Sequence, residues 1–181
     1  MKKQVMFIHS AGPQGIHQGS SGLIAHLQEQ LGEAYHVISP GMPENLDCAL
    51  WKAQIASEIE ELDEELFLIG HSLGGSVLLK YLSEEGCKRT ISGLFLVAAP
   101  YWGKDENWQH EEYTLSKSFA AKLPHISKLI LYHSRHDPVV PFAHAQHYAK
   151  QLPQAVTRTY EGDDHYFGKG LPELVDDIKR M

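Results

Sequence analysis

Residues 67–82 read FLIGHSLGGSVLLKYL, an apolar run that stops at a glycine and then resumes as an amphipathic pattern. Between the two parts, Ser72 is flanked by Gly70 and Gly74, which is the G-x-S-x-G spacing of a sharp turn from a strand into a helix. Side chains at the two glycine positions would collide with the adjoining strand and helix. The spacing therefore predicts that Ser72 is held out at the carboxyl end of a strand as a candidate nucleophile; a plain glycine-rich turn is the alternative.

A serine hydroxyl is a weak nucleophile near neutral pH, so Ser72 would need a base that is itself oriented by a carboxylate. On a strand-turn-helix elbow, the three groups occur along the chain in the order serine, acid, histidine. Asp137 lies in a proline-stiffened turn just after the apolar run 128–133, and His165 lies just after the run 155–160. We therefore predict Ser72 as nucleophile, Asp137 as acid and His165 as base.

Other histidines compete for the role of base, because the chain contains 12 of them. His133 and His136 precede Asp137, which violates the expected order. His144 and His147 are spaced i, i+3 on one helix face and could grip a metal, but no acidic partner accompanies them. A solvated helix face is the simpler interpretation, and we predict neither a metal nor any other cofactor.

Two further carboxylates, those of Asp163 and Asp164, stand directly before His165. Adjacent residues in a tight loop rarely aim a carboxylate at the neighbouring imidazole, so Asp137 is preferred as the acid. An oxyanion needs two donors. We assign one to the amide of Leu73 at the start of the helix and, by position, the other to the amide of Ala11 in the loop 9–15, where a turn without any catalytic role is the alternative.

Residues 100–124 are longer than an ordinary connection between a strand and a helix, and Tyr101, Trp102 and Trp108 stand there among charged residues. They form either an active-site flap or a surface excursion. We expect Tyr101, Trp102 and Trp108, together with His71 beside the nucleophile, to bind substrate in a small, partly aromatic pocket that prefers short acyl chains. Burial of the rings in the core is the competing interpretation.

The composition limits the function classes. A chain of 181 residues that is 43% hydrophobic can bury one sizeable core, so we expect one domain spanning residues 1–181. Its net charge of -7 should repel nucleic acid and anionic membranes. Cys48 and Cys87 lack the CxxC spacing and are expected to be reduced thiols of a cytoplasmic protein. The start of the chain lacks the apolar core of a signal peptide, and no apolar run approaches the roughly 18 residues of a membrane span.

Apolar runs of strand length alternate with amphipathic stretches along the whole chain. The expected strands are 5–9, 36–39, 66–70, 93–99, 128–133 and 155–160, and the expected helices are 20–31, 49–62, 73–85, 141–152 and 171–181. Regular alternation of this kind predicts an α/β fold, in which a doubly wound parallel sheet is covered by helices on both faces. We find no internal repeat and no linker.

Four stretches taken together resemble the α/β-hydrolase superfamily, and the resemblance covers nearly the whole chain. They are HSAG (9–12), GHSLG (70–74), SRHDPVVP (134–141) and GDDH (162–165). The small size, the lack of a large inserted lid and the stretch MPENLDCALW (42–51) are similar to the compact serine hydrolases of the YdeN and retinoblastoma-binding protein nine group. Ser10 departs from the pattern, because it follows His9 where the superfamily commonly has glycine.

The resemblance implies a sheet of about six parallel strands in the order 2-1-3-4-5-6, with Ser72 and Ala11 flanking the topological switch point where such sheets bind ligands. It implies a carboxylesterase-like serine hydrolase that acts on a small ester or related acyl substrate. Thioester hydrolysis and acyl transfer would use the same residues. A ligand- or protein-binding module without turnover is the alternative from another class, because a fold alone does not fix function. Oligomeric state is not indicated.

Overall fold

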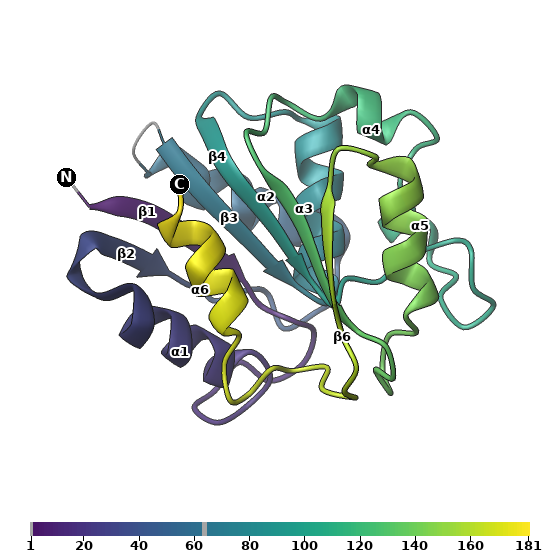
Figure 1. Ribbon diagram of the computed structural model, residues 1–181. Helices are drawn as coiled ribbons and strands as arrows, with labels where there is room; N and C mark the ends of the chain where they lie inside the picture. The colour runs from purple at the N-terminus through teal and green to yellow at the C-terminus, as the bar shows by residue number, and fades with distance from the viewer. Residues whose placement is uncertain (1, 63–64) are drawn as a thin grey trace.

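The computed structural model describes residues 2–62 and 65–181, which form one six-stranded parallel sheet (Figure 1). The strand order is β2-β1-β3-β4-β5-β6, which confirms the predicted order and fold class. The strands are β1 (Lys3–Ile8), β2 (Tyr35–Ile38), β3 (Glu65–His71), β4 (Thr90–Val97), β5 (Leu129–Ser134) and β6 (Val156–Tyr160).

Helices cover both faces of this sheet, as Figure 1 shows. The helices α1 (Ser21–Leu31) and α6 (Pro172–Lys179) lie on one face, and α2 (Cys48–Glu60), α3 (Leu73–Glu84) and α5 (Ala143–Gln151) lie on the other. The segment between β4 and β5 contains two short helices, the 3-10 helix η2 (Glu111–Tyr113) and the four-residue helix α4 (Phe119–Lys122). Another 3-10 helix, η1 (Gly32–Ala34), precedes β2. None of the helices in the described part of the chain is long and apolar enough to cross a membrane.

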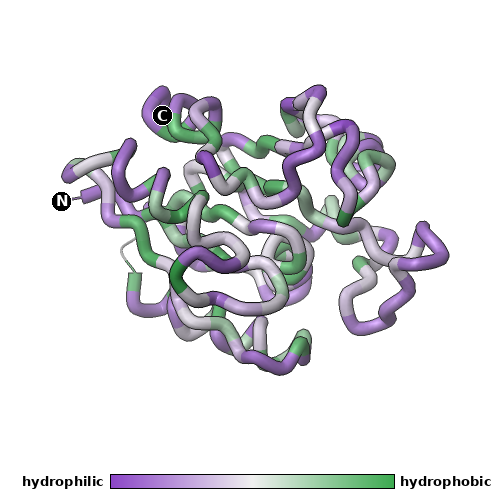
Figure 2. Tube along the Cα trace, turned by 90° about the horizontal axis from the view of Figure 1, so that it is seen from below, coloured by the Kyte–Doolittle hydropathy of each residue, from purple (hydrophilic) through white to green (hydrophobic). Residues whose placement is uncertain are grey.

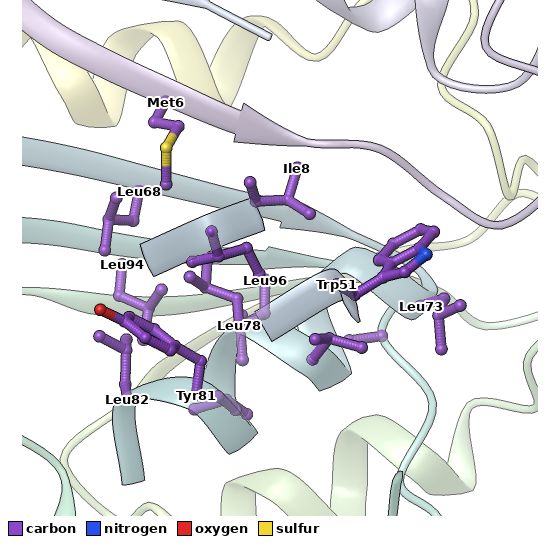
Figure 3. Close-up of a cluster of buried hydrophobic side chains, with 14 of the residues drawn as sticks. Met6, Ile8, Trp51, Leu68, Leu73, Leu78, Tyr81, Leu82, Leu94 and Leu96 are labelled. Atoms are coloured by element: carbon purple, nitrogen blue, oxygen red, sulfur yellow. The ribbon is translucent and has the colours of Figure 1, made fainter. Parts of the chain in front are cut away.

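Alternation along the strands divides the apolar side chains between two clusters, one on each face of the sheet. In Figure 3, Met6, Leu68 and Leu94 of neighbouring strands lie together with Leu78 and Leu82 of α3. The strand residues that alternate with these, such as Val5 and Phe7 of β1, point to the other face and pack under α1 and α6. Figure 2 shows the result along the chain, with apolar residues in the interior and polar residues on the outer turns.

The carboxyl ends of all six strands meet at one edge of the sheet. The chain leaves β1 toward β2 on one side and leaves β3 toward β4 on the other, so the two connections diverge between β1 and β3. In such sheets the crevice at this switch point is where ligands bind. The fold therefore brings the ends of β1, β3, β5 and β6 to one place, and with them the four sequence stretches singled out above.

Candidate active site

Ser72 sits in a strained turn between β3 and α3. Its φ of 52° and ψ of -122° lie outside the regions that residues with a side chain ordinarily adopt. A Cβ on Gly70 would approach Gly75 Cα at 2.5 Å, and a Cβ on Gly74 would strike the carbonyl oxygen of His9. The structure thus gives the physical reason for both glycines, and it holds Ser72 at the N-terminus of α3.

Asp137 and His165 meet at the same edge, although 28 positions separate them. His165 Nδ1 lies 2.7 Å from Asp137 Oδ2, and the other carboxylate oxygen accepts the amides of Val139 at 2.8 Å and Val140 at 2.9 Å. Burial alone would raise the pKa of Asp137, but these hydrogen bonds outweigh it and hold the pKa below its ordinary value. An ionised Asp137 keeps the proton of His165 on Nδ1 and leaves Nε2 free to accept another.

Ser72 and His165 border one cavity of about 180 Å³. The lining residues that could take part in the chemistry are Ser10, Ala11, Ser72, Leu73 and His165. The other residues that line the cavity are aliphatic, aromatic or proline, namely Leu46, Pro100, Trp102, Trp108, Tyr113, Val139 and Tyr166. The predicted nucleophile, the predicted base and the two residues predicted to supply oxyanion donors therefore border the same small space.

The protein family described as serine hydrolase matches residues 21–165. The chain belongs to this family. No curated protein sequence matches the chain.

Solved structures share the fold at low sequence identity. The ydeN gene product from B. subtilis has a TM-score of 0.81 at 19% identity, with 99% of this chain and 98% of that chain covered. Est1E from Butyrivibrio proteoclasticus has a TM-score of 0.70 at 16% identity, with 99% and 86% covered. The mouse alpha/beta hydrolase domain-containing protein 10 has a TM-score of 0.67 at 16% identity, with 98% and 88% covered. This serine hydrolase therefore has an α/β-hydrolase fold.

The two aspartates that precede His165 differ in their surroundings. Asp164 Oδ1 accepts the amides of Tyr166 at 3.0 Å and Phe167 at 2.8 Å, and its carbonyl oxygen accepts the Ser134 hydroxyl at 2.6 Å. Asp164 thereby shapes the turn that carries His165, while Asp163 is exposed to solvent. The preference for Asp137 as the partner of His165 agrees with this geometry.

A second imidazole, that of His133, lies near Asp137, and the sequence did not predict this contact. His133 Nε2 donates to the carbonyl oxygen of Val140 at 2.8 Å and lies 3.6 Å from Asp137 Oδ2. Burial lowers the pKa of His133, so this ring is neutral. His133 stands four residues before Asp137 near the end of a strand, and this spacing could have indicated the contact. Chain order excluded His133 as the base and says nothing about its contact with Asp137. His136 is exposed.

Two predicted substrate contacts need correction. His71 is fully buried, with both ring nitrogens engaged, and does not border the cavity. The ring of Tyr101 turns away and packs against Tyr148 and Phe119, with ring centroids 4.9 and 6.4 Å apart. Both residues are next to the site in sequence, but the His71 side chain is buried in the interior and the half-buried Tyr101 ring packs on residues of α4 and α5.

The two predicted tryptophans do border the cavity. Trp102 and Trp108 have ring centroids 4.9 Å apart, and the indole N–H of Trp102 donates to Ser76 Oγ of α3 at 3.2 Å. Tyr113 packs on Trp102 at 4.9 Å and donates its hydroxyl proton to the carbonyl oxygen of Leu46. Trp102, Trp108 and Tyr113 thus form an aromatic wall of the cavity. Hydrogen bonds attach this wall to α3 and to Leu46, which precedes α2. Tyr113 and Leu46 lie in stretches that the sequence had singled out, although neither residue was named.

His144 and His147 have other contacts in the structure. His144 Nδ1 accepts the amide of Tyr101 at 2.8 Å, and the ring of His147 lies 5.5 Å from that of Tyr101. Within residues 2–62 and 65–181, no group of three or more His, Cys, Asp or Glu side chains is placed to hold a metal ion.

Proposed function

We propose that this serine hydrolase is a carboxylesterase-like enzyme that cleaves small, uncharged acyl esters through Ser72, His165 and Asp137. The observation that carries the proposal is the 2.7 Å contact between His165 Nδ1 and Asp137, with His165 and a strained, cavity-lining Ser72 bordering the same space. A binding module has no physical need for a buried carboxylate that orients an imidazole beside a serine held in a strained turn.

In the proposed reaction, Ser72 Oγ attacks the carbonyl carbon of the ester while His165 Nε2 takes the serine proton. Asp137 stays ionised and stabilises the imidazolium. The negative charge on the former carbonyl oxygen is stabilised by the amides of Leu73 and Ala11. His165 then returns its proton to the leaving alcohol, which departs. A water molecule repeats the sequence on the acyl-enzyme and releases the carboxylic acid.

The cavity supports a short and neutral acyl group. A space of about 150 Å³ holds a benzene ring, so about 180 Å³ accommodates a short aliphatic chain or one small ring. Among the described residues that line the cavity there is no lysine or arginine, and the chain carries a net charge of -7, so these residues offer a substrate carboxylate no cationic partner. The two free thiols, Cys48 and Cys87, fit a reducing compartment such as the cytoplasm.

A series of p-nitrophenyl esters from acetate to decanoate tests the proposal. We expect kcat/KM to be highest for acetate and butyrate and to fall as the chain outgrows the aromatic wall. Turnover should survive dialysis against EDTA, because the mechanism uses no metal. Faster turnover of the long esters would overturn the substrate class, and a Ser72→Ala protein as active as the wild type would overturn the mechanism. Comparing an alkyl thioester with its oxygen ester, and adding an alcohol acceptor, separates thioester hydrolysis and acyl transfer from ester hydrolysis.

A further inference from the structure

His71, the last residue of β3, is a buried histidine with two defined partners. Its Nε2 lies 2.9 Å from the main-chain oxygen of His165, and its Nδ1 lies 2.8 Å from Ser20 Oγ. A carbonyl oxygen can only accept, so Nε2 carries the proton and Nδ1 accepts the proton of the Ser20 hydroxyl. Burial lowers the pKa of His71 to about 3, which keeps the ring neutral at neutral pH, and the two hydrogen-bond partners fix the tautomer.

Ser20, which immediately precedes α1, continues the chain of hydrogen bonds toward the cavity. Ser20 Oγ accepts the amide of Ser10 at 2.9 Å, and the two hydroxyl oxygens lie 3.1 Å apart. Ser20 is fully buried and Ser10 is 4% exposed. Because the only proton of Ser20 goes to His71, the Ser10 hydroxyl is the donor of that pair. Ser10 is bonded to the nitrogen of Ala11, the proposed second oxyanion donor.

We propose that His71 is a positioning residue that fixes two parts of the site relative to each other: the turn that carries His165 and the amide of Ala11. Through the His165 carbonyl it fixes the turn that carries the base, and through Ser20 and Ser10 it fixes the amide of Ala11. The inference rests on the esterase mechanism proposed above. Both groups must sit within a fraction of an ångström of their working positions, because a displacement of about 1 Å can lower a rate by about 10².

A matched pair of variants separates the two links. His71→Gln puts an amide donor near the position of Nε2 and keeps the contact with His165. His71→Asn puts an amide oxygen near the position of Nδ1 and keeps the contact with Ser20. We expect kcat for p-nitrophenyl acetate to fall about 10²-fold in His71→Ala and about tenfold in each amide variant, with KM within about threefold of the wild type.

Adding Ser20→Ala supplies the decisive comparison. In the His71→Gln background, the contact between residue 71 and Ser20 is already lost, and Ser20 holds Ser10 without that anchor. The Ser20→Ala change should therefore lower kcat there by about twofold or less. On His71→Asn, where that link remains, it should lower kcat by about tenfold more. In proton NMR, the signal of the His165 Nδ1 proton should persist in His71→Gln and broaden in His71→Asn. His136→Gln, a change at an exposed histidine near the site, is the control and should leave kcat unchanged.

Circular dichroism establishes which variants fold, and the amide pair decides the question if His71→Ala does not. Values of kcat within twofold of the wild type in both amide variants would overturn the proposal. If their melting temperatures fell at the same time, the His71 ring would stabilise the fold without positioning the site. Equal effects of Ser20→Ala in both backgrounds would also overturn it. These outcomes leave wild-type turnover intact, whereas failure of the wild type to hydrolyse esters or react with a fluorophosphonate would refute the esterase mechanism itself.

Discussion

Among residues 2–62 and 65–181, two aspartates are buried, and their surroundings differ in kind. Asp177 of α6 accepts two hydrogen bonds of 2.6 Å from Arg158 of β6 and one of 2.8 Å from the Tyr132 hydroxyl of β5. Asp137 is held by an imidazole at 2.7 Å and by two main-chain amides. One carboxylate therefore faces a guanidinium that never releases its proton, and the other faces a ring that can gain and lose one.

This difference assigns each carboxylate a task. The hydrogen bonds with Asp177 raise the pKa of Arg158 still further, so this pair joins α6 permanently to the end of the sheet. Asp137 lies at the carboxyl edge, where its charge orients His165 and, in the proposed mechanism, would stabilise an imidazolium. Burial and a low pKa alone do not distinguish the two residues; the chemistry of the partner does.

The largest expected effect comes from Asp137→Asn. The amide would no longer fix the proton on Nδ1 of His165, and kcat should fall by about 10³ to 10⁴. The free energy of unfolding should change much less, because the side-chain oxygen can still accept the amides of Val139 and Val140. Steady-state kinetics and urea unfolding of the same preparation check both statements. A tenfold or smaller loss of kcat would remove Asp137 from the proton path.

Asp177→Asn should show the opposite profile. Removing one partner of a buried ion pair leaves Arg158 uncompensated, and we expect a loss of about 2 to 3 kcal/mol in the free energy of unfolding. This is less than for a fully buried pair, because the Arg158 side chain is 34% exposed. At a temperature where the variant is folded, kcat should stay within about threefold of the wild type. A large loss of kcat in the folded variant would show that the comparison is wrong.

Acid should weaken the Asp177 pair in a defined range of pH. Burial would raise the pKa of Asp177, but hydrogen bonds from Arg158 and Tyr132 outweigh it and hold the pKa below its usual range. Such a carboxylate stabilises the fold above its unfolded pKa of about 3.9, and the stabilisation is lost as the pH falls through the lower folded value. In urea unfolding, the difference between wild type and Asp177→Asn should be constant from about pH 5 to 8 and shrink below about pH 4. A difference that grew on acidification would contradict this assignment.

The smallest effect is expected at a carboxylate that belongs to neither group. Asp163 is exposed two residues before His165, the proposed base, and Asp163→Asn should change kcat by about twofold or less and leave the melting temperature nearly unchanged. Kinetics and a thermal melt of this variant set the background for the two buried sites. A tenfold change in kcat would mean that the acid had been assigned to the wrong residue.

The sequence supported some of these conclusions and not others, for physical reasons. The meeting of Asp137 with His165 follows from chain order, because the loops after parallel strands all emerge at one edge. The order of the strands came only from the resemblance to the α/β-hydrolases, because alternation of strands and helices does not fix which strands are neighbours. The contacts of His71 with Ser20 and His165 join residues 51 and 94 positions apart, and no local pattern encodes them. The directions of the side chains of His71 and Tyr101 likewise depend on how the elements pack, which a sequence pattern does not specify.

The most direct test of the central claim is reaction with a fluorophosphonate followed by mass analysis of the labelled peptide, because only an activated serine reacts quickly. We predict one label per chain, located on Ser72. Labelling should be abolished in Ser72→Ala, much slower in Asp137→Asn and as fast as in the wild type in Asp177→Asn. A folded wild-type protein that takes up no label, or takes it up at a residue other than Ser72, would contradict the account.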